Sequence, residues 1–240
     1  MIPKKVKNLV HSFLRRNNYE LIKYPYGDLA KRMELINKYK IKTIFDVGAN
    51  IGEFAESMQL CGFIGRIVSF EPRKEAFNEL LKKTQLTTDW QCVNIGLGDT
   101  DSTAVINVAG NKTSSSLLEM NKLHTDIKPH SKYCGTEEIL LKRLDTIVFD
   151  YVKPSEEIYL KIDTQGFEKH VIDGAQNSLS NIRLIQLEMS LAELYKGSML
   201  IFDMIPYLEK KGYFLCSIER GFHDKVTGRL LQVDGLFFRF

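Results

Sequence analysis

Hydrophobic and polar positions follow one consistent pattern from Ile41 onward. Short β-rich runs such as TIFDVG and RIVSFEP alternate with helical segments such as GEFAESMQL. Further strands are expected at WQCVNIG, EIYLKIDTQG and NIRLIQLEMS. Strands and helices that alternate at this spacing are typical of a mostly parallel sheet with helices on both faces. Residues 41–240 are therefore predicted to form one α/β domain with a Rossmann-like sheet.

Two segments depart from this alternation. The run STAVINVAG follows a turn at DTDS and alternates like a strand, which predicts a hairpin inserted after the third strand. At the other end of the domain, YFLCSIER and RLLQVDGLFFRF come after the last helix with a short link between them. They predict an antiparallel hairpin on one edge of the sheet.

The first 40 residues form a separate basic leader. Val6, Leu9, Val10, Phe13 and Leu14 have the spacing of one face of a helix. Residues 1–40 contain ten Lys or Arg and three acidic residues, a net charge of +7, whereas residues 41–240 have 23 and 27, a net charge of −4. Either this amphipathic helix packs on its own domain, or residues 1–18 contact an anionic surface such as a membrane.

Composition excludes several classes of protein. With 240 residues, 44% of them hydrophobic, the chain has enough apolar side chains for a core. It has no apolar run of about 20 residues that would cross a bilayer, and no secretory signal. Its four cysteines form no CxxC pair, which argues against a zinc knuckle and a disulfide framework. We expect a cytoplasmic protein, with the leader at the inner face of the membrane if it binds one.

The most informative candidate site is the turn after the first strand. Asp46 is followed by Gly48, Ala49, Asn50 and Gly52, small residues that let the backbone approach a ligand closely. A dinucleotide site favours GxGxxG at this turn, whereas this chain has GANIG with an acid two residues before it. An acid there repels phosphate and attracts an amino group.

The second strand ends in another acid, Glu71, 25 residues after Asp46. A carboxylate at this point is placed to accept hydrogen bonds from both hydroxyls of a ribose. The two acids together indicate a pocket for an adenosine that carries a cationic amino acid. S-adenosylmethionine is such a ligand.

Several motifs continue this pattern through the domain. They are Phe45 to Gly52, Phe70 to Pro72, Asn94 with Leu97 to Asp99, Arg143 to Asp145, Leu160 to Asp163 with Gly166 and Glu168, and Gly174 with Ala175. In these motifs, over residues 41–238, the chain resembles the FkbM family of S-adenosylmethionine-dependent methyltransferases. The resemblance implies a class I methyltransferase fold and methyl transfer to a hydroxyl oxygen of a sugar, a polysaccharide or a secondary metabolite. One departure is Gln165, where the family usually has an acid.

The resemblance also implies the residues that bind the cofactor. Gly48, Ala49, Asn50 and Gly52 would line its methionine and ribose parts, with Asp46 near the amino end. The expected ribose and adenine contacts are Glu71, Pro72, Asn94 and Asp99. Asp99 has a second interpretation, because the Asp of a DTDS turn can cap its own backbone.

Methyl transfer to an alcohol also requires removal of a proton by a general base or with a metal ion. Asp163, at the end of the fourth core strand, is the first candidate for either role. Glu188 ends the next strand and is predicted to share Mg²⁺ with Asp163, or else to pair with a basic side chain. His124 and His130, in a Ser-rich loop, are alternative bases. Glu168 complements a helix dipole in one interpretation, and His170 is expected to be structural.

The acceptor remains open at this point. A glycan or glycolipid precursor and a polyketide or peptide natural product both present suitable hydroxyls. An RNA methyltransferase or RNA-binding protein is an alternative suggested by the basic leader, but a net charge of −4 over residues 41–240 has the wrong sign for a phosphate track. No nucleic-acid partner is therefore expected. The sequence carries no pattern that sets an oligomeric state.

Overall fold

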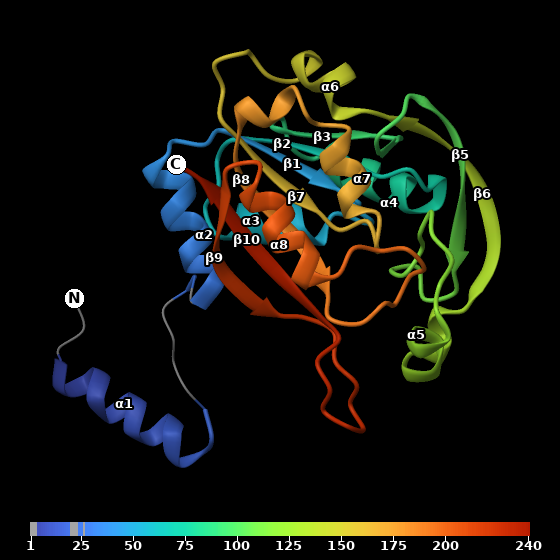
Figure 1. Cartoon of the computed structure of the whole chain (residues 1–240). Coiled ribbons are helices and arrows are strands. Elements are labelled where there is room, and N and C mark those ends of the chain that lie inside the picture. The colour runs from blue at the N-terminus through green and yellow to red at the C-terminus, as the bar shows by residue number, and fades with distance from the viewer. Residues whose placement is uncertain (1–3, 20–23, 26) are drawn as a thin grey trace.

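A seven-stranded sheet forms the centre of the molecule in this computed structural model, which describes residues 4–19, 24–25 and 27–240 (Figure 1). The strand order is β3-β2-β1-β7-β8-β10-β9. The strands are β1 (Thr43–Val47), β2 (Arg66–Phe70), β3 (Trp90–Val93), β7 (Ile158–Ile162), β8 (Ile182–Ser190), β9 (Tyr213–Arg220) and β10 (Gln232–Arg239). The first five run parallel to one another, and β10 pairs antiparallel with β8 on one side and with β9 on the other. The α/β fold with an antiparallel edge hairpin is confirmed; β10 joins the sheet and β9 lies at its edge.

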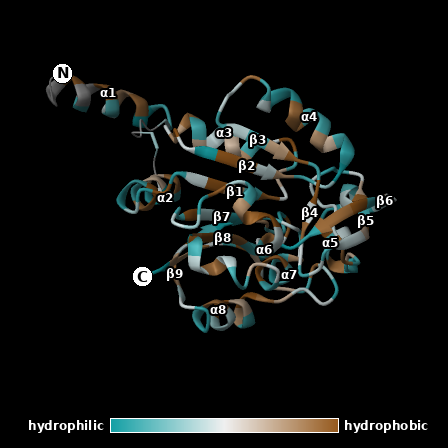
Figure 2. Ribbon diagram, turned by 90° about the horizontal axis from the view of Figure 1, so that it is seen from above, coloured by the Kyte–Doolittle hydropathy of each residue, from teal (hydrophilic) through white to brown (hydrophobic). Residues whose placement is uncertain are grey.

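Helices cover both faces of this sheet (Figure 2). One face carries α2 (Gly27–Lys38), α3 (Glu53–Leu60) and α4 (Lys74–Thr84), whose buried side chains share a core. The other face carries α6 (Leu144–Ile147), α7 (Glu168–Asp173) and α8 (Ile201–Glu209). The expected boundary at residue 40 does not separate α2 from the domain, because Met33, Leu35 and Ile36 of α2 are buried in the core.

The strands next to the middle of the sheet are buried on both faces. In β1, Phe45 and Val47 contribute to the core under α6, α7 and α8, while Ile44 contributes to the core under α2 and α3. Asp46 and Lys161 follow the alternation of Ile44 and lie on the α2 and α3 side. Two charged side chains therefore stand within a layer that is otherwise mostly apolar.

A second, three-stranded sheet follows β3, at the place where the sequence predicted an inserted hairpin. It contains β4 (Gly96–Leu97), β5 (Ser102–Ala109) and β6 (Tyr133–Lys142) in the order β4-β6-β5. The strands β5 and β6 form the expected antiparallel hairpin, and β4 adds a short parallel strand. The long connection between β5 and β6 carries α5 (Lys122–Ile127) and a 3₁₀ turn at Pro129–Ser131. Further 3₁₀ turns lie at Val148–Asp150 and Ser178–Asn181.

The basic leader begins with α1 (Lys4–Arg16), which stands apart from the sheet and its covering helices (Figure 1). Its apolar residues Val6, Val10 and Phe13 are exposed. The alternative in which this helix packs on its own domain is therefore not the arrangement seen here. Across the described part of the chain, no helix combines the length and the apolar character needed to cross a bilayer.

Candidate active site

A cavity of about 450 Å³ opens where the parallel strands β1, β2 and β7 end. This is the edge at which open α/β sheets bind their ligands. Six residues predicted from the sequence line the cavity: Gly48, Ala49, Asn50, Glu71, Pro72 and Asp163. The fold thus brings together the turn after β1, the end of β2 and the end of β7.

The turn from β1 into α3 has no space for a side chain at Gly48 or at Gly52. Gly48 has φ +73°, and a Cβ on it would stand 1.9 Å from the carbonyl oxygen of Asp163. Gly52 has φ +88°, and a Cβ there would meet the ring of Trp90 at 2.6 Å. The backbone amides of Gly48 and Ala49 donate to the carbonyl of Phe70 at 3.0 and 3.1 Å. These contacts hold the start of α3 at the cavity, where helix amides favour a ligand carboxylate.

Glu71 is a buried carboxyl group on the cavity wall. The backbone amide of Asn50 donates to its Oε2 at 2.8 Å, and that of Arg73 donates to Oε1 at 2.9 Å. Burial raises the pKa of Glu71 to about 7, although both hydrogen bonds oppose the shift. The carboxyl group is therefore positioned rigidly and changes its charge near neutral pH.

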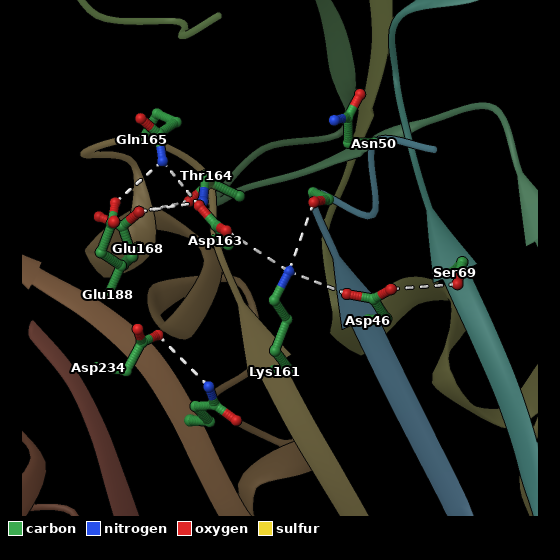
Figure 3. A network of polar contacts seen from close by, with 12 residues as sticks. Asp46, Asn50, Ser69, Lys161, Asp163, Thr164, Gln165, Glu168, Glu188 and Asp234 are labelled. Carbon is green, nitrogen blue, oxygen red and sulfur yellow. Dashed lines mark hydrogen bonds and ion pairs between the residues drawn. The ribbon is translucent and has the colours of Figure 1, made fainter. Parts of the chain in front are cut away.

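Lys161 connects three parts of the site from below (Figure 3). Its Nζ lies 3.0 Å from Asp46 Oδ1, 3.5 Å from the carbonyl of Gly48 and 3.8 Å from Asp163 Oδ2. Its side chain is 9% exposed and that of Asp46 is 0% exposed. Burial opposes the charge of Lys161, but Asp46 and Asp163 outweigh it and raise the pKa of the amine. Asp46 thus pairs with Lys161 beneath the turn.

Gln165 joins the two carboxylates that were predicted to take part in catalysis (Figure 3). Its Nε2 donates to Asp163 Oδ1 at 2.8 Å and to Glu188 Oε2 at 2.9 Å. The hydroxyl of Tyr195 donates to Gln165 Oε1 at 2.7 Å, which fixes the direction of the amide. Burial, followed by the charges of Asp163 and Glu168, raises the pKa of Glu188 well above its ordinary value.

Glu168 stabilises the loop that carries Gln165. Its Oε1 accepts hydrogen bonds from the backbone amides of Thr164 and Gly166, each at 3.0 Å. Burial raises its pKa to about 7. Glu168 therefore acts as a cap of the turn before α7 and holds Asp163 and Gln165 in place from behind.

Other predicted residues lie away from the cavity lining. The Asn94 amide donates to the carbonyls of Glu71 and Pro72, each at 2.9 Å, and so supports the end of β2. Asp99 pairs with His170 Nδ1 at 2.8 Å. His124 is buried against the rings of Tyr195 and Phe222, and burial lowers its pKa to about 4. The structure does not bring these three residues to the cavity lining.

Five further residues that line the cavity were not predicted from the sequence. They are the polar residues Arg32, Lys161, Gln186 and Asp234 together with Phe54, and we call this part of the lining the polar extension. Gln186 Nε2 donates to Asp234 Oδ1 at 3.3 Å, and Tyr159 donates to Gln186 Oε1. The one available signal was a lysine, a glutamine and an aspartate inside otherwise apolar strands. Arg32 carried no signal because it lies in the leader.

Comparisons with known proteins identify the class of this site. The methyltransferase FkbM domain matches residues 46–215. No curated protein sequence matches the chain significantly. One similar solved structure is a putative S-adenosylmethionine-dependent methyltransferase from Listeria monocytogenes, with 9% identity, a TM-score of 0.49, and coverage of 83% of this chain and 91% of that one.

A second similar structure is a putative RNA methyltransferase from Pyrococcus horikoshii. It has 9% identity and a TM-score of 0.46, and the match covers 88% of this chain and 83% of the other. At such TM-scores, likeness supports no argument about the substrate. The domain match itself implies S-adenosylmethionine, and the small-residue turn, the buried Glu71 and the cavity fit that ligand.

We expect the pH dependence of cofactor binding to report on Glu71. Ribose hydroxyls donate to a carboxylate, so affinity for S-adenosylmethionine should rise as pH increases through about 7 and Glu71 loses its proton. Between pH 6 and pH 8 the expected gain is about tenfold. Calorimetry should show this gain in the wild type and in the control Glu79→Gln, an exposed site on α4. An equal gain in Glu71→Gln would contradict the assignment.

Lys161→Met should destabilise the domain strongly. The substitution keeps the length of the side chain but leaves the carboxylate of Asp46 buried without its cation, at a cost of about 3–5 kcal/mol in the free energy of unfolding. Urea unfolding measures this loss. Lys169→Met, which removes a lysine from a surface pair with Asp173, should cost less than about 1 kcal/mol; equal losses in the two variants would contradict the role of Lys161.

Proposed function

The chain belongs to the FkbM family of methyltransferases, and on that premise we propose that it is an O-methyltransferase whose acceptor is a hydroxyl of a sugar, a polysaccharide or a glycolipid precursor. The observation that carries the proposal is the carboxylate of Asp163. It lines the cavity at the end of β7, next to the turn of Gly48. An acid on this lip is suited to receive the proton of an alcohol.

Bound S-adenosylmethionine supplies a methyl group that is already activated on a sulfonium. The protein then has two tasks, to hold the acceptor oxygen in line and to remove its proton. Asp163 takes the second task. Lys161 at 3.8 Å and the Gln165 amide at 2.8 Å keep its carboxylate oriented toward the cavity.

Asp163 and Glu188 have different roles in this proposal: Asp163 is the base, and Glu188 is a neighbouring carboxyl group that can hold a proton. Glu188 lies deeper, accepts hydrogen bonds from Gln165 and Gln232, and has a pKa raised chiefly by burial. Asp163 is more open, with 41% of its side chain exposed. Two carboxyl groups whose environments differ in this way are a common basis for separate acid and base roles.

The donor set does not favour the Mg²⁺ that was predicted between these carboxylates. The Gln165 amide already donates to both of them, and an amide nitrogen is not a ligand of Mg²⁺. Within the described residues, no three His, Cys, Asp or Glu side chains cluster as metal ligands. We therefore derive no catalytic step through a metal ion.

The polar extension supports a polyhydroxylated acceptor. Gln186, Asp234 and Arg32 offer planar donors and acceptors, which suit neighbouring hydroxyl groups. The ring of Phe54 adds an apolar surface beside them. A polyketide or peptide natural product is the alternative acceptor, and it would contact Phe54 more than the polar residues of the extension. The −4 charge of residues 41–240 remains the argument against an RNA acceptor.

Asp163→Asn should lower methyl transfer by about 10²–10⁴-fold, the usual contribution of a general base. S-adenosylmethionine affinity, measured by calorimetry, should stay within about threefold, because the variant keeps the size of the side chain and one oxygen that can accept from Gln165. Transfer is followed with radiolabelled methyl donor and a panel of sugar nucleotides and oligosaccharides. Asp150→Asn, on the exposed turn after α6, is the matched control. Unchanged turnover in Asp163→Asn with cofactor bound would exclude this residue as the base.

Removal of divalent ions should leave the activity unchanged. Because Gln165 takes the position between the two carboxylates, dialysis against EDTA should alter the transfer rate by less than about twofold. Gln165→Glu should convert the site into three neighbouring carboxyl groups, and added Mg²⁺ should then change its activity. Loss of wild-type activity on chelation, restored by Mg²⁺, would instead support the metal-assisted alternative.

A further inference from the structure

Three apolar side chains of α1 are exposed to solvent. Val6, Val10 and Phe13 stand at i, i+4 and i+7, so they share one side of the helix, and they are 49%, 43% and 68% exposed. Both general views show α1 beside the domain rather than on it (Figures 1 and 2). A helix of 13 residues is marginally stable in water when nothing packs against it. We therefore expect α1 to be stabilised when its exposed apolar side chains pack against a partner outside the domain.

The rest of the helix is strongly basic. The segment KKVKNLVHSFLRR has five Lys or Arg and no acid. Arg15 and Arg16 lie in the last turn, where cations also complement the helix dipole. The partner must then accept apolar side chains and a high density of positive charge at the same time.

Three kinds of partner meet these requirements to different extents. A nucleic acid would pair with the basic residues but leave Phe13 in water. A second copy of the helix would cover Phe13 but bring two clusters of five positive charges together. The interface of an anionic bilayer satisfies both sides, because acyl chains receive the apolar residues and lipid headgroups receive the basic ones.

We propose that α1 binds the surface of an anionic membrane, with Val6, Val10 and Phe13 inserted at the boundary of headgroups and acyl chains. Binding is reversible and sensitive to salt, because the apolar side is small and the charges lie at the surface. This goes beyond the proposed methyl transfer, and it would place the cavity near acceptors that are themselves carried on lipids.

The test uses the full-length protein and vesicles of phosphatidylcholine, alone or with phosphatidylglycerol. Wild-type protein should sediment with the anionic vesicles at low salt and be released by about 0.5 M salt, where screening is strong. Phe13→Glu should bind at least about tenfold more weakly, because it loses the largest inserted side chain. The matched control Ser12→Glu introduces the same charge one residue away on the exposed polar side and should lose no more than about fivefold.

Each result decides the proposal. Equal losses in Phe13→Glu and Ser12→Glu would show that the apolar side is not inserted, and equal binding to neutral and anionic vesicles would show that charge is not used. Absence of vesicle binding, or a dimer that Phe13→Glu converts into a monomer, would also overturn it. Methyl transfer to a soluble acceptor should be the same in all three proteins, so a failure here is separable from a failure of the proposed activity.

Discussion

The ion pair of Lys161 with Asp46 is the interaction on which the site depends. The two residues are register partners in the adjacent strands β7 and β1, and both are buried. A buried pair of this kind tolerates the loss of neither partner, because the remaining charge has no access to water. The lysine also reaches the Gly48 carbonyl and Asp163. One side chain thus links the turn after β1 to the carboxylate of Asp163.

Several carboxyl groups in or beside the cavity have little contact with water. Burial raises the pKa of Glu71 and Glu168 to about 7 and raises those of Glu188 and Asp234 as well. The negative charge of the site therefore increases as pH rises through neutrality. A cationic cofactor compensates such charges, whereas a diphosphate would be repelled by them. The electrostatics agree with the class of cofactor that the family implies.

The net charge is distributed unequally between the N-terminal 40 residues and the rest of the chain. Residues 41–240 have the acidic excess, while α1 has five basic residues and no acid. Two of the basic residues that line the cavity are paired with acids, Lys161 with Asp46 and Arg32 with Glu219. Because α1 stands beside the domain, this basic segment lies apart from the cavity (Figure 1).

The sequence by itself determined the features that depend on local patterns. The alternation of strands and helices, the small-residue turn after β1, the acid at the end of β2 and the inserted hairpin all follow from spacing within about ten residues. The tertiary structure alone decided which side chains meet. Asp46 faces Lys161 because parallel pairing sets the register of β1 and β7, strands more than 100 residues apart. Gln165 lies between Asp163 and Glu188 because the parallel strands β7 and β8 are neighbours in the sheet. The period of two assigns a residue to a face of its strand, but its partner there is set by long-range packing. For the same reason, only the packing of α2 on the sheet shows that Arg32 lines the cavity.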